Sequence, residues 1–200
     1  MFRHVRSCCG LLVATMAFIG CAGSGPRADT DYRTVRDAPG RDTELARQHH
    51  SRALDLIDAE EYDEAERALR QSLQADVMFG PAHNNLGKVY FKQRRLYQAA
   101  WEFQYAARLM PHHPEPRNNL GLVFEDVGQL DEAVDHYREA MKISPDNPQL
   151  IGNLARARIR RGDRDEKLVD LLQQLVGKDT RPEWVQWARE RLALMHIPKS

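Results

Sequence analysis

Residues 83–103 read HNNLGKVYFKQRRLYQAAWEF, and residues 117–137 read RNNLGLVFEDVGQLDEAVDHY. The second segment begins 34 residues after the first, and the small and apolar positions of the two coincide. The Leu-Gly dipeptide of the first copy, for example, superposes on that of the second. A fixed period of this length indicates a supersecondary unit that stacks on copies of itself.

The small residues of this unit predict helices that approach one another closely. Gly87 and Gly121 fall in the middle of apolar helical patterns, where glycine costs about 1 kcal/mol relative to alanine. A neighbouring helix packed against each glycine would explain its presence. Alanines recur at the same offset in the second half of the unit, and prolines, which cannot be accommodated in a helix interior, close it: Ala65, Ala99, Ala133, Pro111 and Pro145.

This pattern resembles the signature of the tetratricopeptide repeat, in which Leu-Gly-x-x-Tyr is followed by Ala-x-x-x-Phe and a closing proline. The resemblance implies an all-α, right-handed solenoid of helical hairpins, with about three to four repeats and a C-terminal capping helix. Within a repeat domain at 43–197, the expected units are repeats at about 46–79, 80–113 and 114–147, a degenerate repeat at 148–179, and the capping helix at 181–195.

The expected capping helix carries apolar residues on one face, which predicts that it covers the open end of the stack. A docking site built on its tryptophans is the alternative. The residues of this face are Trp184, Ala188, Leu192 and Met195.

The first 20 residues resemble the signal peptide of a bacterial lipoprotein. Arg3 and Arg6 precede an apolar stretch that is too short to span a bilayer. The stretch ends in FIGCAGSG, which is similar to a lipobox, and Cys21 would then be the lipidated N-terminus. Residues 21–42 read as the lipidated cysteine and a flexible tether. Ordinary cleavage, or retention as an anchor, is the alternative.

The lipoprotein resemblance implies a location in the cell envelope, on the periplasmic face of a bacterial membrane. By the same resemblance, Ala22 after the cysteine indicates the outer membrane. The partners that we expect are therefore a membrane, through the lipid anchor, and a protein or an extended peptide.

Composition argues against several other functions. Lys plus Arg and Asp plus Glu both number 29, so no global field favours nucleic acid. No cysteine follows Cys21, and the histidines do not have metal-ligand spacing, so we expect no disulfide framework and no metal site. The sequence contains no phosphate-binding loop and no nucleophile elbow. We expect no enzymatic activity, no cofactor and no small-molecule substrate.

The face opposite the packing residues of each first helix carries a recurring asparagine. In tetratricopeptide arrays the first helices line a concave groove, so the resemblance implies that this face looks into the groove. A side-chain amide can pair with both the N–H and the C=O of an extended peptide. The expected groove residues are the asparagines and two further rows: Asn85, Asn119 and Asn153; Lys88, Leu122 and Arg156; Lys92, Asp126 and Arg160.

Mixed charge at the centre of these rows and basic residues at their ends favour a ligand with acidic groups. The alternative is that the asparagines belong to the repeat consensus and only solvate the groove. The carboxylate clamp of chaperone-binding tetratricopeptide domains is not expected. Among the positions that match the clamp residues, only Asn85 has the required residue type. Five arginines, Arg156, Arg158, Arg160, Arg161 and Arg164, are interpreted as one solvated, partner-facing helix.

These observations predict a non-enzymatic adaptor or scaffold of the cell envelope that binds an extended peptide or a partner protein in a concave groove. Two alternatives remain. One is an assembly factor for type IV pili or secretins, similar to pilotins, and the other is a self-associating structural scaffold.

Overall fold

The computed structural model describes residues 40–195. Of the expected N-terminal features, the signal peptide, Cys21 and all but the end of the tether lie outside the described residues. Residues 40–195 form α-helices joined by short turns, and contain no strand. The helices are α1 (Thr43–Asp58), α2 (Tyr62–Ala75), α3 (Gly80–Lys92), α4 (Leu96–Leu109), α5 (Glu115–Asp126), α6 (Leu130–Ile143), α7 (Pro148–Arg161), α8 (Glu166–Lys178) and α9 (Pro182–Met195).

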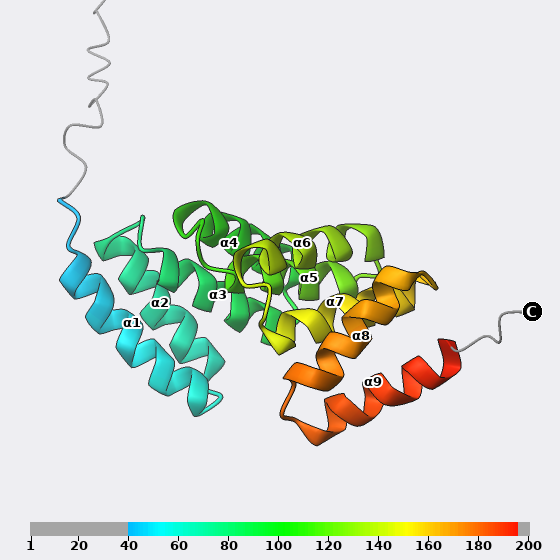
Figure 1. Cartoon of the computed structure of the whole chain (residues 1–200). Helices are drawn as coiled ribbons and strands as arrows, with labels where there is room; N and C mark the ends of the chain where they lie inside the picture. Colours follow the sequence, from blue (N-terminus) through cyan, green and yellow to red (C-terminus); the bar gives the residue numbers. More distant parts are fainter. Residues whose placement is uncertain (1–39, 196–200) are drawn as a thin grey trace, which may run out of the picture. The chain divides into compact units, whose positions relative to one another are not determined.

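Consecutive helices pack in pairs, and each pair packs on the next. The hairpins are α1 with α2, α3 with α4, α5 with α6, and α7 with α8, and they follow one another along the stack (Figure 1). The helix α9 packs on α8 after the last hairpin. The prediction of an all-α, helical-hairpin tetratricopeptide solenoid is confirmed.

In each central hairpin, a glycine of the first helix packs against an aromatic ring of the second helix. A Cβ atom added to Gly87 would lie 2.6 Å from the ring of Phe103, and one added to Gly121 would overlap the ring of Tyr137. Both rings are buried. The close approach inferred from the sequence is therefore made by an aromatic side chain of the second helix.

The turn inside each hairpin needs one residue in the left-handed region. The residues that occupy it are spaced by 34 and have φ angles of 58°, 63°, 80° and 99°: Glu60, Arg94, Gly128 and Gly162. Left-handed backbone costs little for glycine but about 1 kcal/mol or more for other residues. The first two hairpins therefore accept a small local cost in order to keep the geometry of the repeat.

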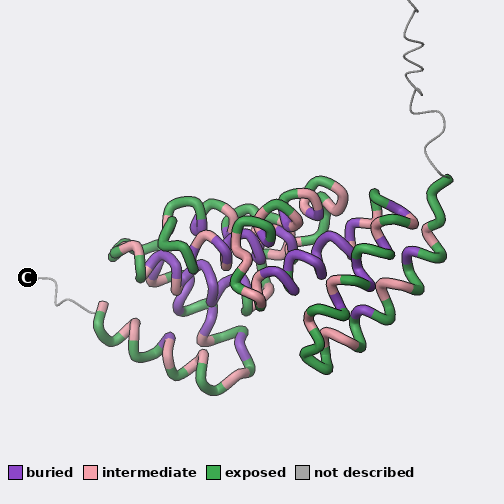
Figure 2. The backbone as a smooth tube through the Cα atoms, turned by 180° about the vertical axis from the view of Figure 1, so that it is seen from behind, coloured by how far each residue is buried: buried purple, intermediate pink, exposed green. Residues whose placement is uncertain are grey.

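The core runs along the stack in two clusters of buried side chains. One joins the first two hairpins to α5, and the other joins the last two hairpins to α9. Figure 2 shows buried segments through the middle of the stack, whereas α9 has mainly exposed and half-buried residues. On α9, Ala188 is fully buried, and Trp184 packs against Gly152 of α7. The apolar face expected on this helix does meet the last hairpin.

Candidate functional site

An apolar pocket of about 350 Å³ opens where the first helices of three successive hairpins meet. Four of the expected groove residues line it, namely Lys88, Lys92, Asn119 and Leu122. Its other walls are Ile57, Tyr62, Val89, Phe91 and Phe103. The pocket thus brings together four of the six predicted groove residues of α3 and α5, and Asn85 and Asp126 do not line it.

Two lysines stand at this pocket with their charges uncompensated by ion pairs. Lys88 and Lys92 are one turn apart on α3, and both are exposed. Neither forms a salt bridge with any residue between 40 and 195. The site combines an apolar cavity with two available ammonium groups.

The remaining charged residues of the predicted rows form ion pairs with other residues of the same chain. Asp126 pairs with Arg94 at 2.8 Å. Arg156 donates two hydrogen bonds to the carboxylate of Glu125, both at 2.9 Å, and Arg160 donates a third at 3.0 Å. The basic end expected at α7 is therefore largely neutralised by a carboxylate from the preceding repeat.

Glu125 is the centre of this cluster, and sequence reasoning did not place it there. Its side chain is only 5% exposed and also accepts a hydrogen bond from the Tyr137 hydroxyl at 2.8 Å. Burial raises the pKa of Glu125, but the guanidinium of Arg156, with Tyr137 and Arg160, outweighs burial and holds the pKa below its usual value. Burial and the nearby Glu125 carboxylate raise the pKa of Tyr137. The cluster ties the third repeat to the fourth.

The paired asparagines connect successive repeats to one another. The amide of Asn119 donates to the side-chain oxygen of Asn84 at 3.0 Å, and that of Asn153 donates to Asn118 at 2.8 Å. All four residues are buried, and so is Asn85. Asn119 and Asn153, which occupy equivalent positions in α5 and α7, thus each bond to the first asparagine of the pair in the preceding hairpin. We call this series of bonds the asparagine ladder.

The helical wheel placed Asn85 on the open face of α3 with Lys88 and Lys92, whereas the structure leaves it only 8% exposed. The reason is that α1 packs beside α3, which a pattern for a single helix does not include. A role of Asn85, Asn119 and Asn153 in binding a peptide stays a prediction, and the observed role of their amides is to join repeats.

Other residue types occupy the two ends of the asparagine ladder. In the first hairpin the equivalent of Asn84 is His50, whose Nε2 lies 2.7 Å from the amide nitrogen of Asn85. Burial lowers the pKa of His50, and the positive charge of Lys88 lowers it further, so the neutral ring that can accept this hydrogen bond is favoured. In the fourth hairpin the equivalent residue is Gly152, which has no side chain to accept a bond and is covered by Trp184.

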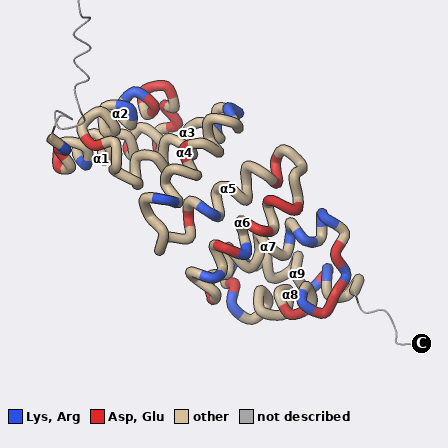
Figure 3. The backbone as a smooth tube through the Cα atoms, turned by 90° about the horizontal axis from the view of Figure 1, so that it is seen from above, with Lys and Arg blue, Asp and Glu red and all other residues tan. Residues whose placement is uncertain are grey.

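The interpretation of the arginine cluster of α7 as a solvated, partner-facing surface is wrong for most of its members. Arg158 is only 4% exposed and donates to Asp163 and Asp165. Arg161 donates to Asp163 and to Asp131 of the preceding hairpin, and its guanidinium lowers the pKa of Asp163. The carboxylates in the turn between α7 and α8 thus pair with these arginines within the hairpin. Figure 3 shows basic and acidic residues at intervals along the helices, separated by longer uncharged stretches.

A smaller pocket, of about 270 Å³, lies between α7 and α9. It is lined by Arg156, Glu183, Trp184 and Trp187. The guanidinium of Arg156 lies 5.6 Å from the centre of the Trp184 ring, which is a cation–π distance. This pocket is the closest structural counterpart of the docking alternative for the C-terminal helix.

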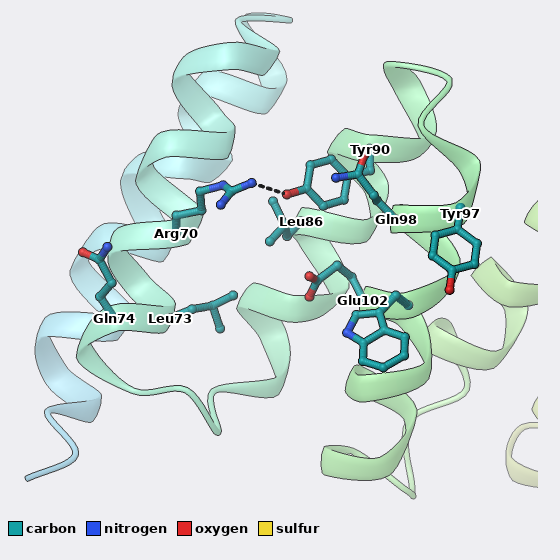
Figure 4. A pocket seen from close by; sticks show the side chains of 9 residues that line it. Arg70, Leu73, Gln74, Leu86, Tyr90, Tyr97, Gln98 and Glu102 are labelled. Atoms are coloured by element: carbon teal, nitrogen blue, oxygen red, sulfur yellow. Dashed lines mark hydrogen bonds between the residues drawn. The ribbon is translucent and has the colours of Figure 1, made fainter. Parts of the chain in front are cut away.

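A third pocket, of about 470 Å³, lies between α2 and α4, and the sequence analysis did not mark it. Figure 4 shows Arg70 and Gln74 of α2 across from Tyr97 and Gln98 of α4. Leu73 and Leu86 contribute apolar lining, and Trp101 also borders the pocket. Tyr97 and Trp101 are 84% and 56% exposed. Comparison of equivalent positions in α2, α4 and α6 would have revealed them.

Metal-binding clusters and membrane-spanning helices are both absent from residues 40–195. No group of three His, Cys, Asp or Glu residues there is arranged to hold a metal ion. None of the helices in this range combines the length and the apolar character needed to cross a membrane.

Comparison with known proteins identifies the repeats. Residues 50–114 and residues 114–147 match two models that are both described as tetratricopeptide repeat. Comparison with curated proteins gave no match. These residues are therefore recognised as tetratricopeptide repeats, in a fold that is typical of protein-interaction and peptide-binding modules.

Solved structures with the same fold share little sequence with this chain. PilF of Pseudomonas aeruginosa is 19% identical with a TM-score of 0.69, and the match covers 76% of this chain and 69% of PilF. YrrB, described as having an unusual peptide-binding site, is 21% identical with a TM-score of 0.62, over 74% of this chain and 76% of its own. The first repeat domain of RPAP3, solved with the HSP90 peptide SRMEEVD, is 18% identical with a TM-score of 0.59, over 61% and 97%.

Proposed function

We propose that this protein is a non-enzymatic adaptor that binds an extended segment of a partner protein along the first helices of its repeats. The observation that carries the proposal is the 350 Å³ pocket, whose walls are mainly apolar and whose edge holds Lys88 and Lys92. An apolar pocket with a few convergent polar groups is the usual form of a binding site. Repeat solenoids present such surfaces to extended ligands.

The pocket chemistry defines the ligand class. An apolar side chain of the ligand enters between Phe91 and Leu122, and acidic groups beside that side chain meet the ammonium groups of Lys88 and Lys92. Because both lysines are exposed, each contact with a carboxylate contributes at most about 1 kcal/mol, and burial of the apolar side chain contributes about 1.5–3 kcal/mol. Affinity therefore comes mainly from the cavity, and the lysines add selectivity for acidic segments.

The asparagine ladder supports this proposal indirectly. It holds α3 and α5 in register, and these helices supply most of the pocket walls. Asn119 itself lines the pocket. An amide nitrogen carries two hydrogens and the amide oxygen has two lone pairs, so Asn119 can still meet a peptide backbone group while it bonds to Asn84.

A phage-displayed library of short random peptides tests the proposal. We expect the selected peptides to combine an apolar residue with acidic neighbours and to bind the protein with micromolar affinity in fluorescence anisotropy. Lys88→Glu with Lys92→Glu should weaken binding at least tenfold at low salt, and Leu122→Asp should abolish it. The matched control is Lys142→Glu, an exposed lysine on α6, which should bind as the parent does. Failure to select any peptide, or equal loss in the control, would exclude this site.

We propose further that the protein is lipid-anchored in the cell envelope, because Arg3, Arg6, the apolar stretch and Cys21 follow the pattern of a lipoprotein signal. Metabolic labelling with a fatty-acid analogue tests this proposal. The label should enter the parent chain and not a Cys21→Ala variant, and the protein should fractionate with the outer membrane. Equal labelling of both chains, or none, would contradict the anchor.

The adaptor role competes with two alternatives. The likeness to PilF is one of fold, so an assembly factor for pili or secretins remains a second candidate, and deletion followed by an assay of pilus assembly separates it from the adaptor. A self-associating scaffold is the third candidate, and it requires a surface outside the pocket formed by the first helices.

A further inference from the structure

The outer face of α4 differs from the matching faces of its neighbours. Four exposed positions recur in α2, α4 and α6 at the 34-residue spacing. All four are charged in α2 and again in α6, and none is charged in α4. The residues are Asp63, Glu64, Arg67 and Arg70 in α2; Tyr97, Gln98, Trp101 and Gln104 in α4; and Asp131, Glu132, Asp135 and Arg138 in α6.

This internal comparison shows that Tyr97 and Trp101 are not required by hairpin packing. The neighbouring hairpins form the same contacts between their helices with charged residues at these positions. An aromatic side chain left 84% exposed, as Tyr97 is, keeps apolar area in contact with water and stabilises nothing in the isolated chain. The two aromatic residues therefore need an explanation outside the fold of a single chain.

A cavity lies beside these projecting side chains. The 470 Å³ pocket between α2 and α4 has Leu73 and Leu86 in its lining, with Tyr97 and Trp101 on its α4 side (Figure 4). A projection and a recess next to each other on one surface are self-complementary under a two-fold rotation, since each copy then inserts its projection into the recess of the other.

The charges around the pocket are already paired. Arg70 bonds to Glu66 at 2.8 Å, and Glu102 bonds to His83 at 2.6 Å. A residue close to a two-fold axis lies near its own copy, so unpaired charges near the axis repel one another. The exposed residues Tyr97, Gln98 and Trp101 avoid this repulsion, and glutamine can donate to and accept from its own copy.

We propose that the α4 face is a homodimer surface, in which Tyr97 and Trp101 of one copy enter the α2–α4 pocket of a second copy. Burying these two aromatic side chains from both copies, with the pocket walls that they cover, removes on the order of 1,000 Å² from water, which is about the minimum for a specific interface. The dimer is therefore weak and reversible. It leaves free the pocket formed by α1, α3 and α5, and it does not depend on whether that pocket binds a peptide.

Cysteine cross-linking in the full chain tests the geometry of this surface. A Gln98→Cys variant, treated in its membrane fraction with a short bis-maleimide, should give several-fold more cross-linked dimer than Glu132→Cys, which places the thiol at the equivalent position of α6. Cys8, Cys9 and Cys21 are common to both variants and to the parent, so they contribute equal background. Equal cross-linking of the two variants, or capture of a different protein in place of a second copy, overturns the proposal.

Replacing the two aromatic residues with the charged residues of the equivalent α6 positions tests how much they contribute to dimerisation. Tyr97→Asp with Trp101→Asp introduces at these positions the residues that α6 already has there, on exposed sites where the fold should be retained. In sedimentation velocity of the detergent-solubilised full chain, the parent should dimerise as concentration rises, and the double variant should dimerise at least tenfold more weakly with unchanged helicity by circular dichroism. A parent that stays monomeric, or a double variant that dimerises equally, rejects the interface. If the double variant loses helicity, the single Trp101→Gln replaces it, with the same two outcomes.

Discussion

The side-chain amide of Asn153 in α7 donates a hydrogen bond of 2.8 Å to the side-chain oxygen of Asn118 in α5. The two residues are 35 positions apart, one repeat plus one residue, and both are buried. Buried polar groups are costly unless they are paired, so each bond favours one relative position of two neighbouring hairpins. The Asn-Asn dipeptide of the repeat supplies one acceptor and one donor to this arrangement.

Coupling between these two asparagines is the first prediction. Asn118→Ala and Asn153→Ala should each destabilise the protein by about 1–3 kcal/mol, because each leaves a buried partner unsatisfied. The double variant should cost less than the sum, with a coupling of about 0.5–1.5 kcal/mol in urea unfolding. Asn84 and Asn153 share no hydrogen bond, so their double variant should be additive. Additivity in the first pair would show that the bond does not link the repeats.

The histidine of the asparagine ladder should make stability depend on pH. Burial and Lys88 lower the pKa of His50 in the folded state, so the unfolded chain, with a histidine pKa near 6.5, takes up the proton first. The free energy contributed by neutral His50 is full above that value and is lost as the pH falls towards the folded pKa. His50→Asn keeps an acceptor for Asn85 and removes the titration.

We therefore expect the free energy of unfolding of the parent to fall more steeply between about pH 7 and pH 5 than that of His50→Asn. Urea unfolding at a series of pH values measures this difference. His136, whose pKa burial also lowers, contributes equally to both proteins. Parallel curves for the two proteins would mean that His50 has the same pKa folded and unfolded.

Close packing of the central glycines gives a third prediction. Gly121→Ala should destabilise the protein by about 1–3 kcal/mol, the range for an overpacked core, because the added methyl group overlaps the ring of Tyr137. Gly177 lies in α8 with nothing within 4 Å of an added Cβ. Gly177→Ala should instead stabilise the protein by up to about 1 kcal/mol through helix propensity. Thermal and urea unfolding distinguish destabilisation from stabilisation, and a gain in stability at both positions would contradict the packing argument.

The buried carboxylate of Glu125 gives a fourth prediction. Glu125→Gln should cost about 1–3 kcal/mol, since it removes the counter-charge of Arg156 and Arg160, whose side chains are 31% and 49% exposed and stay partly solvated. The folded-state pKa of Glu125 lies below its usual value, so its contribution is present above about pH 4.3 and is lost as the pH falls through the folded pKa.

Acid titration of the free energy of unfolding should therefore be shallower for Glu125→Gln than for the parent below about pH 4.3. Glu139→Gln is the control, because Glu139 is 54% exposed and lies 3.6 Å from Arg117. That variant should follow the parent within about 0.5 kcal/mol. An unchanged acid limb in Glu125→Gln would show that the pKa of Glu125 is the same in the folded and the unfolded chain.

The fold was predictable because its determinants are local and repeated. The period of 34 residues and the position of Gly121 relative to the next helix sufficed to predict helical hairpins, and the structure identifies Tyr137 as the group that needs the space. These signals concern which residues pack within one repeat, and a periodic pattern records that directly.

The candidate site was less predictable because it depends on contacts between repeats. A helical wheel assigns Asn85 to an open face only as long as no neighbouring helix is considered, and α1 removes that opening. Arg156 likewise reads as a free charge until Glu125 of the preceding repeat is seen to meet it. Lys88 kept its expected exposure because no partner carboxylate from an adjacent repeat reaches it within the described residues.

The asparagine ladder also has a direction, and this direction limits how the array can change length. Each bond runs from a donor back to the hairpin before it, beginning at His50, and the series stops at Gly152, which has no acceptor for a later hairpin. A duplicated central hairpin would carry both an acceptor asparagine and a donor asparagine, so it could form the same bonds with the hairpins on either side. A hairpin appended after the fourth would find no acceptor and would have to displace Trp184. Growth of such a protein by internal duplication is therefore compatible with its bonding pattern, and growth at its C-terminal end is not.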